Sequence, residues 1–200
     1  MSNALVIKLF KSKVQAQDVS GYKRDFLNMD LKFFEGKDRN QLINDALEGN
    51  QEDIFNFVLH QFNSQLTLLE KINVARKCCL ESSWVPQMSS LLSKLPVSYQ
   101  TGILLELHED RKKSIQHNGV SLSKEDLVSV LVEKSGKSQE ILEHIKAQKA
   151  DYDNPANKEV MDNYTHLIDQ IESEITYKNI TNALKENSIS MKDQSSTRKM

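Results

Sequence analysis

Part of the sequence between Leu42 and Leu92 recurs after thirty-three residues. When the chain is shifted by that interval, residues of the same kind coincide: Ala46 with Cys79, Leu47 with Leu80, Glu48 with Glu81, Val58 with Leu91, and Leu59 with Leu92. A fixed period in the low thirties is typical of stacked helical repeats. Short helices with one apolar face can hide it from water only by packing side by side. The repeat therefore predicts an all-α fold, built on a short and irregular helical-repeat stack.

The composition agrees with a helical, soluble chain. Only six Gly and three Pro occur among 200 residues, and so few helix breakers favour helices over a strand-rich fold. The net charge of −2 gives the chain no overall attraction for nucleic acid or an anionic membrane. No apolar run approaches the roughly 20 residues that span a bilayer, and Lys8 interrupts the N-terminus too early for a signal peptide.

Breaks and apolar stripes divide the chain into four regions. Residues 1–37 are expected to form an N-terminal helical cap, with a basic amphipathic helix on a membrane surface as the alternative for its first part. Residues 38–151 are expected to form the helical-repeat core, which ends before Pro155 because proline excludes its predecessor from a helix. A long helix over residues 152–186 is expected to pack on this core. The polar residues 187–200 are expected to be a disordered tail.

The long C-terminal helix has its own apolar stripe. Its members recur at spacings of three and four residues: Met161, Tyr164, Ile168, Ile171 and Ile175. This is close to two and a half heptads, short of the three or four that indicate a coiled coil. The stripe therefore predicts a helix that lies along the stack, with a homodimer through residues 155–186 as the alternative.

The first hairpin of the repeat has the features of a helix, a turn and a second helix. Leu42 and Ala46 belong to the apolar stripe of the first helix. Gly49 is expected at the reversal in the left-handed conformation, which glycine adopts without steric cost. Glu52 and Asp53 then open the second helix, where acidic residues suit the positive end of the helix dipole.

This hairpin resembles an ankyrin repeat. The residues that follow the spacing of that family are Leu42, Ala46, Gly49, Asn50, Glu52, Ile54, Phe57 and Val58. A degenerate second unit places Ala75, Cys79, Leu91 and Leu92 at equivalent positions, with Ser82 instead of the glycine. Both units lack the threonine–proline opening of the family, and the resemblance covers about residues 40–93. It implies ankyrin-like helix hairpins; a generic α-solenoid and a chance likeness of two hairpins are the alternatives.

Residues that could perform catalysis or hold a metal are sparse and poorly spaced. Five histidines occur, and no two have the four-residue helical spacing of a zinc motif. Glu140 and His144 could meet on one helical face, which would be half of an acid–base device but is more often a solvated pair. Cys78 and Cys79 are adjacent, so a strained bridge is disfavoured and two reduced core residues are expected. The sequence therefore assigns no catalytic residue, no metal and no cofactor.

Trp84 is the candidate partner-binding residue. It is the only tryptophan, and it is expected in a turn between two helices, where repeat proteins contact ligands. Tryptophan is also a typical anchor at interfaces; the alternative places its ring over the neighbouring repeat. The sequence thus favours a non-enzymatic protein–protein interaction module, with another protein and neither nucleic acid nor a membrane as its partner. An enzyme whose residues are scattered over several helices is the alternative from another class.

The polar tail suggests a setting for such a module. Residues 187–200 resemble the C-terminal translocation signals on substrates of bacterial type IV secretion systems. Ankyrin-like repeats are also frequent in these substrates. The resemblance implies a bacterial effector, or its accessory protein, that is made in the reducing cytoplasm and translocated into a host cytosol.

Overall fold

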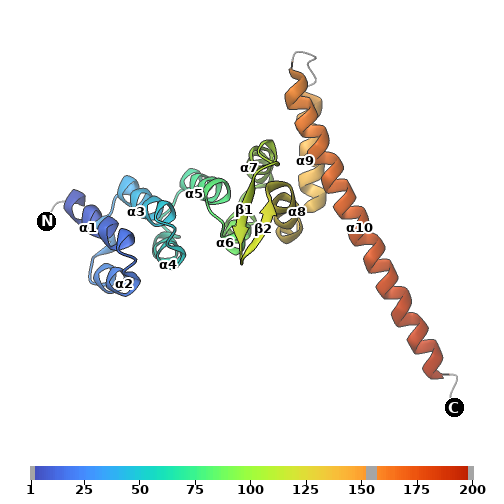
Figure 1. The fold of residues 1–200 in the computed structure, drawn as a ribbon, viewed down its shortest axis with the longest axis horizontal. Coiled ribbons are helices and arrows are strands. Elements are labelled where there is room, and N and C mark those ends of the chain that lie inside the picture. The colour runs from blue at the N-terminus through green and yellow to red at the C-terminus, as the bar shows by residue number, and fades with distance from the viewer. Residues whose placement is uncertain (1–2, 152–156, 198–200) are drawn as a thin grey trace. The chain divides into compact units, whose positions relative to one another are not determined.

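The computed structural model describes residues 3–151 and 157–197, with side chains described as far as Lys185. Across these residues the chain forms ten α-helices, one 3-10 helix and a two-stranded sheet (Figure 1), which confirms the all-α fold class and the long C-terminal helix. The elements are α1 (Asn3–Gln15), α2 (Val19–Leu27), η1 (Leu31–Phe33), α3 (Gly36–Glu48), α4 (Glu52–Phe62), α5 (Leu68–Glu81), α6 (Val85–Leu92), α7 (Val97–Glu109), β1 (Ser114–His117), β2 (Val120–Ser123), α8 (Lys124–Ser135), α9 (Ser138–Asp151) and α10 (Lys158–Thr197).

The chain divides into two compact units. The N-terminal unit comprises the residues up to Leu95 together with Ile115–Ser121. The C-terminal unit comprises Pro96–Ser114 and the chain from Leu122 onward. The region expected as one core, residues 38–151, therefore contributes to both units. The expected cap, residues 1–37, belongs to the N-terminal unit.

Three helix hairpins with the same register build the N-terminal unit. Their second helices, α2, α4 and α6, begin at Val19, Glu52 and Val85, at intervals of thirty-three residues. Helix α3 packs on both α1 and α5, and α2 packs on α4, so that the hairpins form two layers (Figure 1). The repeat thus begins one hairpin earlier than the sequence match indicates, because the residues expected as a cap have the form of a first unit.

The core of this stack has the same period as its helices. Tyr22, Phe55 and Met88 occupy equivalent positions in the three second helices, and each is 0% exposed. Ala46 and Cys79, which coincide when the sequence is shifted by thirty-three residues, are both buried near the ends of α3 and α5. Burial of large apolar side chains at one repeated position is the interaction by which hairpins of this kind stabilise one another.

The turn after α3 differs from the expectation at Gly49. Gly49 has an ordinary φ of −77°, and it is Asn50 that adopts the left-handed conformation, with a φ of 52°. Asparagine tolerates this conformation better than most residues. A glycine is required at position 49 for space, because a Cβ there would collide with Cγ1 of Val14 in α1. The prediction for Gly49 was therefore wrong in its cause, although the turn itself is where the sequence placed it.

A two-stranded β-hairpin follows α7. Asn118 and Gly119 connect β1 to β2, and both have positive φ, 50° and 76°. Two such residues match the twist of a tight hairpin, and Asn-Gly is their commonest sequence. Nδ1 of His117 lies 3.1 Å from the carbonyl oxygen of Ser83, a contact within the N-terminal unit.

Helix α10 organises the C-terminal unit, and its first half packs on α7, α8 and α9. Tyr164, Ile168 and Ile171 are buried there, so most of the stripe that suggested self-association is used inside the chain. From Glu172 to Lys185 no side chain of α10 is buried. None of the described helices is both long and apolar enough to cross a lipid bilayer.

The end of α10 lies beyond the expected position. The sequence placed it near Glu186, whereas the structure continues the helix to Thr197 in place of the tail expected from residue 187. Residues 187–197 contain neither glycine nor proline, so no strong helix breaker ends the helix earlier. Residues 198–200, the last part of the expected tail, lie outside the described residues.

Candidate partner-binding groove

A small groove opens between the second and third hairpins of the N-terminal unit. We call it the inter-hairpin groove; it is lined by residues of α4, α5 and α6 and the turn that follows, and its volume is about 250 Å³. Its apolar lining consists of Leu59, Leu68, Val74, Leu91 and Leu95. Val74 and Leu95 are buried, whereas Leu68 is 50% exposed. The groove therefore presents leucine side chains to solvent above a closed apolar base.

The groove exists because the second interface of the stack lacks an aromatic pair that fills the first interface. Between the first and second hairpins, the rings of Phe26 and Phe57 meet edge to face, with centroids 5.4 Å apart. Thirty-three residues later the equivalent positions hold Leu59 and Ser90, and both line the groove. A leucine and a serine fill much less volume than two phenylalanines. The equivalent positions thus hold two packed rings at the first interface and line a hollow at the second.

The rim of the groove is cationic. Lys71 of α5, Lys94 after α6 and His60 of α4 line it, and the lining contains no carboxylate. Neither Lys71 nor Lys94 forms an ion pair within the part of the chain that the structure describes, although Lys77 nearby pairs with Glu48 at 2.7 Å. The remaining lining side chains, Asn56, Asn63 and Ser90, are neutral and polar.

Trp84, the residue proposed from the sequence as a partner anchor, lies mostly inside the stack. It precedes α6 and is 7% exposed, and its ring centroid is 5.3 Å from that of Phe55 in the preceding hairpin. Its backbone N–H donates to Oγ of Ser82, which in turn donates to the carbonyl oxygen of Cys78. Trp84 also lines a small polar hollow together with Glu52. This geometry matches the alternative in which the ring covers the neighbouring repeat, and a role in partner binding stays a prediction.

The two cysteines are core residues of the third hairpin. Both are buried free thiols on α5. Burial raises the pKa of Cys78 to about 11 and raises the pKa of Cys79 as well. A thiol with a raised pKa carries little thiolate at neutral pH and is a poor nucleophile and metal ligand. No group of three or more metal-binding side chains forms among the described residues.

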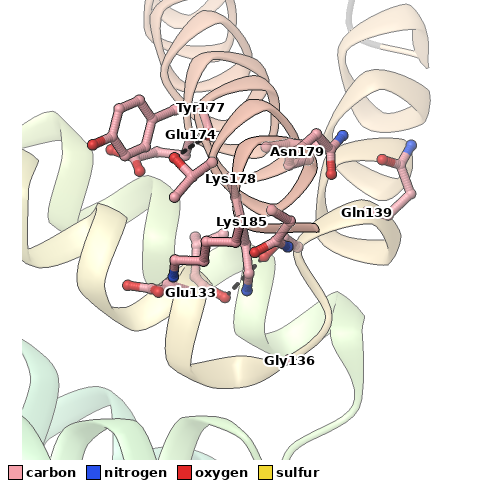
Figure 2. Close-up of a pocket in the computed structure, with 13 residues that line it drawn as sticks. Glu133, Gly136, Gln139, Glu174, Tyr177, Lys178, Asn179 and Lys185 are labelled. Atoms are coloured by element: carbon pink, nitrogen blue, oxygen red, sulfur yellow. Dashed lines mark hydrogen bonds between the residues drawn. The ribbon is translucent and has the colours of Figure 1, made fainter. Parts of the chain in front are cut away.

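A larger cleft lies in the C-terminal unit. It is lined by the exposed part of α10, by the end of α8 and by the start of α9. Figure 2 shows residues of all three helices around it, and its volume is about 590 Å³. Its charged side chains have both signs: Glu133 and Glu174 are acidic, and Lys178 and Lys185 are basic. The mixture of charges favours no particular sign of ligand, in contrast to the inter-hairpin groove.

The acid–base pair considered in the sequence does not form a hydrogen bond in the described residues. Glu140 is exposed on α9, whereas His144 is half-buried and its Nε2 finds no hydrogen-bond partner in the described part of the chain. His108 makes a buried polar contact with a side chain of another helix. Nδ1 of His108 in α7 lies 2.6 Å from Oδ1 of Asn163 in α10, and the two residues are fifty-five positions apart. No local spacing in the sequence could indicate such a contact.

His108 is expected to make the stability of the C-terminal unit depend on pH. Burial is the main cause that lowers its pKa below 6.5, and the nearby positive charge of Arg111 and the proximity of His166 act in the same direction; the hydrogen bond to Asn163 and the charge of Glu125 oppose them. The unfolded chain takes up a proton near pH 6.5, before the folded chain does. We therefore expect the free energy of unfolding to decrease below pH 6.5, by at most about 1.4 kcal/mol per pH unit.

Hydrogen exchange of α7 and α10 amides at about pH 7.5 and about pH 5.5, corrected for intrinsic rates, measures this decrease. The variant His108→Gln cannot titrate and should lose most of it. A decrease that is the same in His108→Gln and in the parent chain would assign the pH dependence to other groups.

Comparisons with known proteins found no matching family model, no matching curated protein and no matching solved structure. The geometry of the chain's own residues is therefore the basis on which its function is inferred.

Proposed function

We propose that the N-terminal unit is a protein-binding module and that the inter-hairpin groove is its ligand site. Stacked helix hairpins commonly bind partners on surfaces built from successive repeats. The likeness of residues 40–93 to ankyrin repeats supports the same class of function, with the hairpin register as its structural basis. The proposal describes a non-enzymatic interaction with another protein.

One observation favours the inter-hairpin groove over the other hollows as the ligand site. The positions that bring Phe26 and Phe57 together at the first interface hold Leu59 and Ser90 at the second. An apolar hollow within a regular stack is a place where a partner's side chain can supply the missing contact. Anchors of this kind, seated in pockets near the centre of an interface, contribute most of the binding energy in many complexes.

The variant Ser90→Phe tests the proposal. Ser90 is exposed on α6, and a phenylalanine there should fill the groove as Phe57 does at the first interface, without loss of the fold. We expect peptides selected from a random display library on the full chain to lose most of their affinity for Ser90→Phe. The matched control is Ser98→Phe, which adds the same side chain at an exposed position on α7.

Two results would contradict this expectation. One is the recovery of peptides that bind the parent chain and Ser90→Phe equally well. The other is a selection that enriches no peptide over an empty support. Circular dichroism of each variant shows whether the helices are retained, so that lost binding is not confused with lost structure.

Self-association through α10 is a second candidate function. The exposed residues Tyr177, Ile180 and Leu184 recur at spacings of three and four, on a part of α10 without buried side chains. Light scattering of the full chain and of Ile180→Glu separates this candidate from the first. A mass above that of one chain, lost in Ile180→Glu, would support it, and the mass of one chain at high concentration would exclude it.

The proposal that the chain is a translocated bacterial effector, or its accessory, depends on the resemblance of residues 187–200 to translocation signals and on the frequency of ankyrin-like repeats in such substrates. A translocation reporter fused to the chain with and without these residues is the test. Equal delivery of both fusions would show that residues 187–200 are not a translocation signal.

A further inference from the structure

We infer that the ligand of the inter-hairpin groove is an acidic peptide segment that inserts a leucine-sized side chain between α4 and α6. This inference rests on the function proposed above and adds the chemistry of the partner. It follows from the size of the groove, from the charges around it and from the difference between the two interfaces of the stack.

The size of the groove suits a side chain. Its volume of about 250 Å³ is below the roughly 300–1,000 Å³ of typical small-molecule pockets. Its walls are helices and the turn after α6, so that recognition depends on side-chain contacts. The exposed face of Leu68 extends the apolar surface beyond the hollow itself. A ligand that places one apolar residue in the hollow and its neighbours on this surface would fit both features.

The charges select an acidic ligand. Lys71 and Lys94 have no ion pair among the described residues, and no carboxylate lines the groove. The nearest acid in the sequence, Glu70, accepts hydrogen bonds from the backbone N–H of Thr67 at 2.7 Å and from Asn40 at 3.2 Å. It is therefore held at the start of α5. A positive rim without an internal partner favours carboxylates on the ligand and disfavours basic segments.

The positive rim is a property of this interface and not of the repeat. The position equivalent to Lys71 in the preceding hairpin is Asp38, and the position equivalent to Lys94 is Gln61. Asp38 is buried and accepts hydrogen bonds from Asn3 at 2.9 Å and from the backbone N–H of Glu35. The acid at the first interface thus has a structural role, whereas the lysine at the second is left for a ligand.

The double variant Lys71→Glu with Lys94→Glu tests the acidic partner. Peptides that the parent chain selects, and that Ser90→Phe releases, should contain a leucine or a similar residue among several Asp and Glu. We expect the double variant to bind them at least about tenfold more weakly, and the parent chain to bind them more weakly at high salt. The matched control is Lys112→Glu with Lys134→Glu, two exposed lysines of the C-terminal unit that form no ion pair with any described side chain, and it should leave the affinity unchanged.

The outcomes separate this inference from the function on which it rests. Selected peptides that depend on Ser90 but are neutral or basic, or that bind the Lys71→Glu, Lys94→Glu variant normally, would overturn the acidic ligand and leave the binding module in place. Peptides that bind Ser90→Phe as tightly as the parent chain would overturn both the acidic ligand and the groove as the ligand site. Equal weakening by the control pair would show a general charge effect and would also overturn the inference.

Discussion

Replacement of Phe26 by alanine should destabilise the N-terminal unit by an amount at or above the upper end of the about 3–5 kcal/mol typical of buried Phe→Ala changes. Phe26 is fully buried in α2. Five other aromatic rings surround it, with centroids between 5.4 and 6.1 Å away: Phe10, Tyr22, Phe34, Phe57 and Phe62. Each such pair contributes about 0.5–1.5 kcal/mol beyond the buried area, so the alanine removes several contacts as well as leaving a cavity.

Domains are commonly stable by only about 5–15 kcal/mol, so this single change is expected to leave the three hairpins partly unfolded at room temperature. Native-state hydrogen exchange of α1 to α6 measures the loss. The neighbouring substitution Leu27→Ala is the control, since Leu27 is 65% exposed and its removal should change stability by less than about 0.5 kcal/mol. Similar protection in Phe26→Ala and Leu27→Ala would show that the aromatic cluster does not hold the first two hairpins together.

The same cluster explains why the sequence repeat revealed the second and third hairpins but not the first. The match by residue identity and kind between Leu42 and Leu92 found the second and third hairpins, because Ala46 and Cys79 are both small. The first hairpin has residues of other sizes at its equivalent positions. Tyr22 corresponds to Phe55 in the repeat, and Gly21 corresponds to Ile54. A packed core tolerates substitutions as long as the total side-chain volume is conserved. A hairpin can therefore keep its place in the stack while its individual residues diverge.

Other differences between expectation and structure arise from contacts that are distant in sequence. The requirement for glycine at position 49 comes from Val14 in another helix, which no property of the turn itself reveals. The hydrogen bond between His108 and Asn163 is of the same kind. The β-hairpin at Asn118–Gly119 is different, because this dipeptide is a strong local signal for a tight hairpin that the short strands on either side would have supported.

The groove itself could have been predicted once the repeat was known. The sequence places Ser90 thirty-three residues after Phe57 and Leu59 thirty-three residues after Phe26. A comparison of side-chain volumes at these positions shows a loss of two aromatic rings at the second interface. What the sequence could not show is that the space stays open, since a neighbouring side chain could have filled it. The structure is needed to place Lys71 and Lys94 around one hollow.

Replacement of Trp84 by alanine is the second change with a large expected effect. The ring is mostly buried and packs on Phe55, so its removal should cost about 3–5 kcal/mol in the stability of the N-terminal unit. Chemical denaturation followed by circular dichroism measures this cost. Loss of partner binding in Trp84→Ala would then follow from unfolding as readily as from a lost anchor, so this variant alone does not identify a binding residue.

Trp84→Phe separates the two roles. A phenylalanine keeps most of the apolar contact with Phe55 inside the stack and changes the side chain at the polar hollow that Trp84 lines with Glu52. If the inter-hairpin groove is the ligand site, peptides that depend on Ser90 should bind Trp84→Phe and the parent chain equally well. A variant that keeps its helices and its unfolding midpoint but loses those peptides would make Trp84 an anchor, as its position in a turn between helices first suggested. The groove and the hollow that Trp84 lines together with His117 share no lining residue, so the change to phenylalanine is expected to leave the surface of the groove itself unaltered.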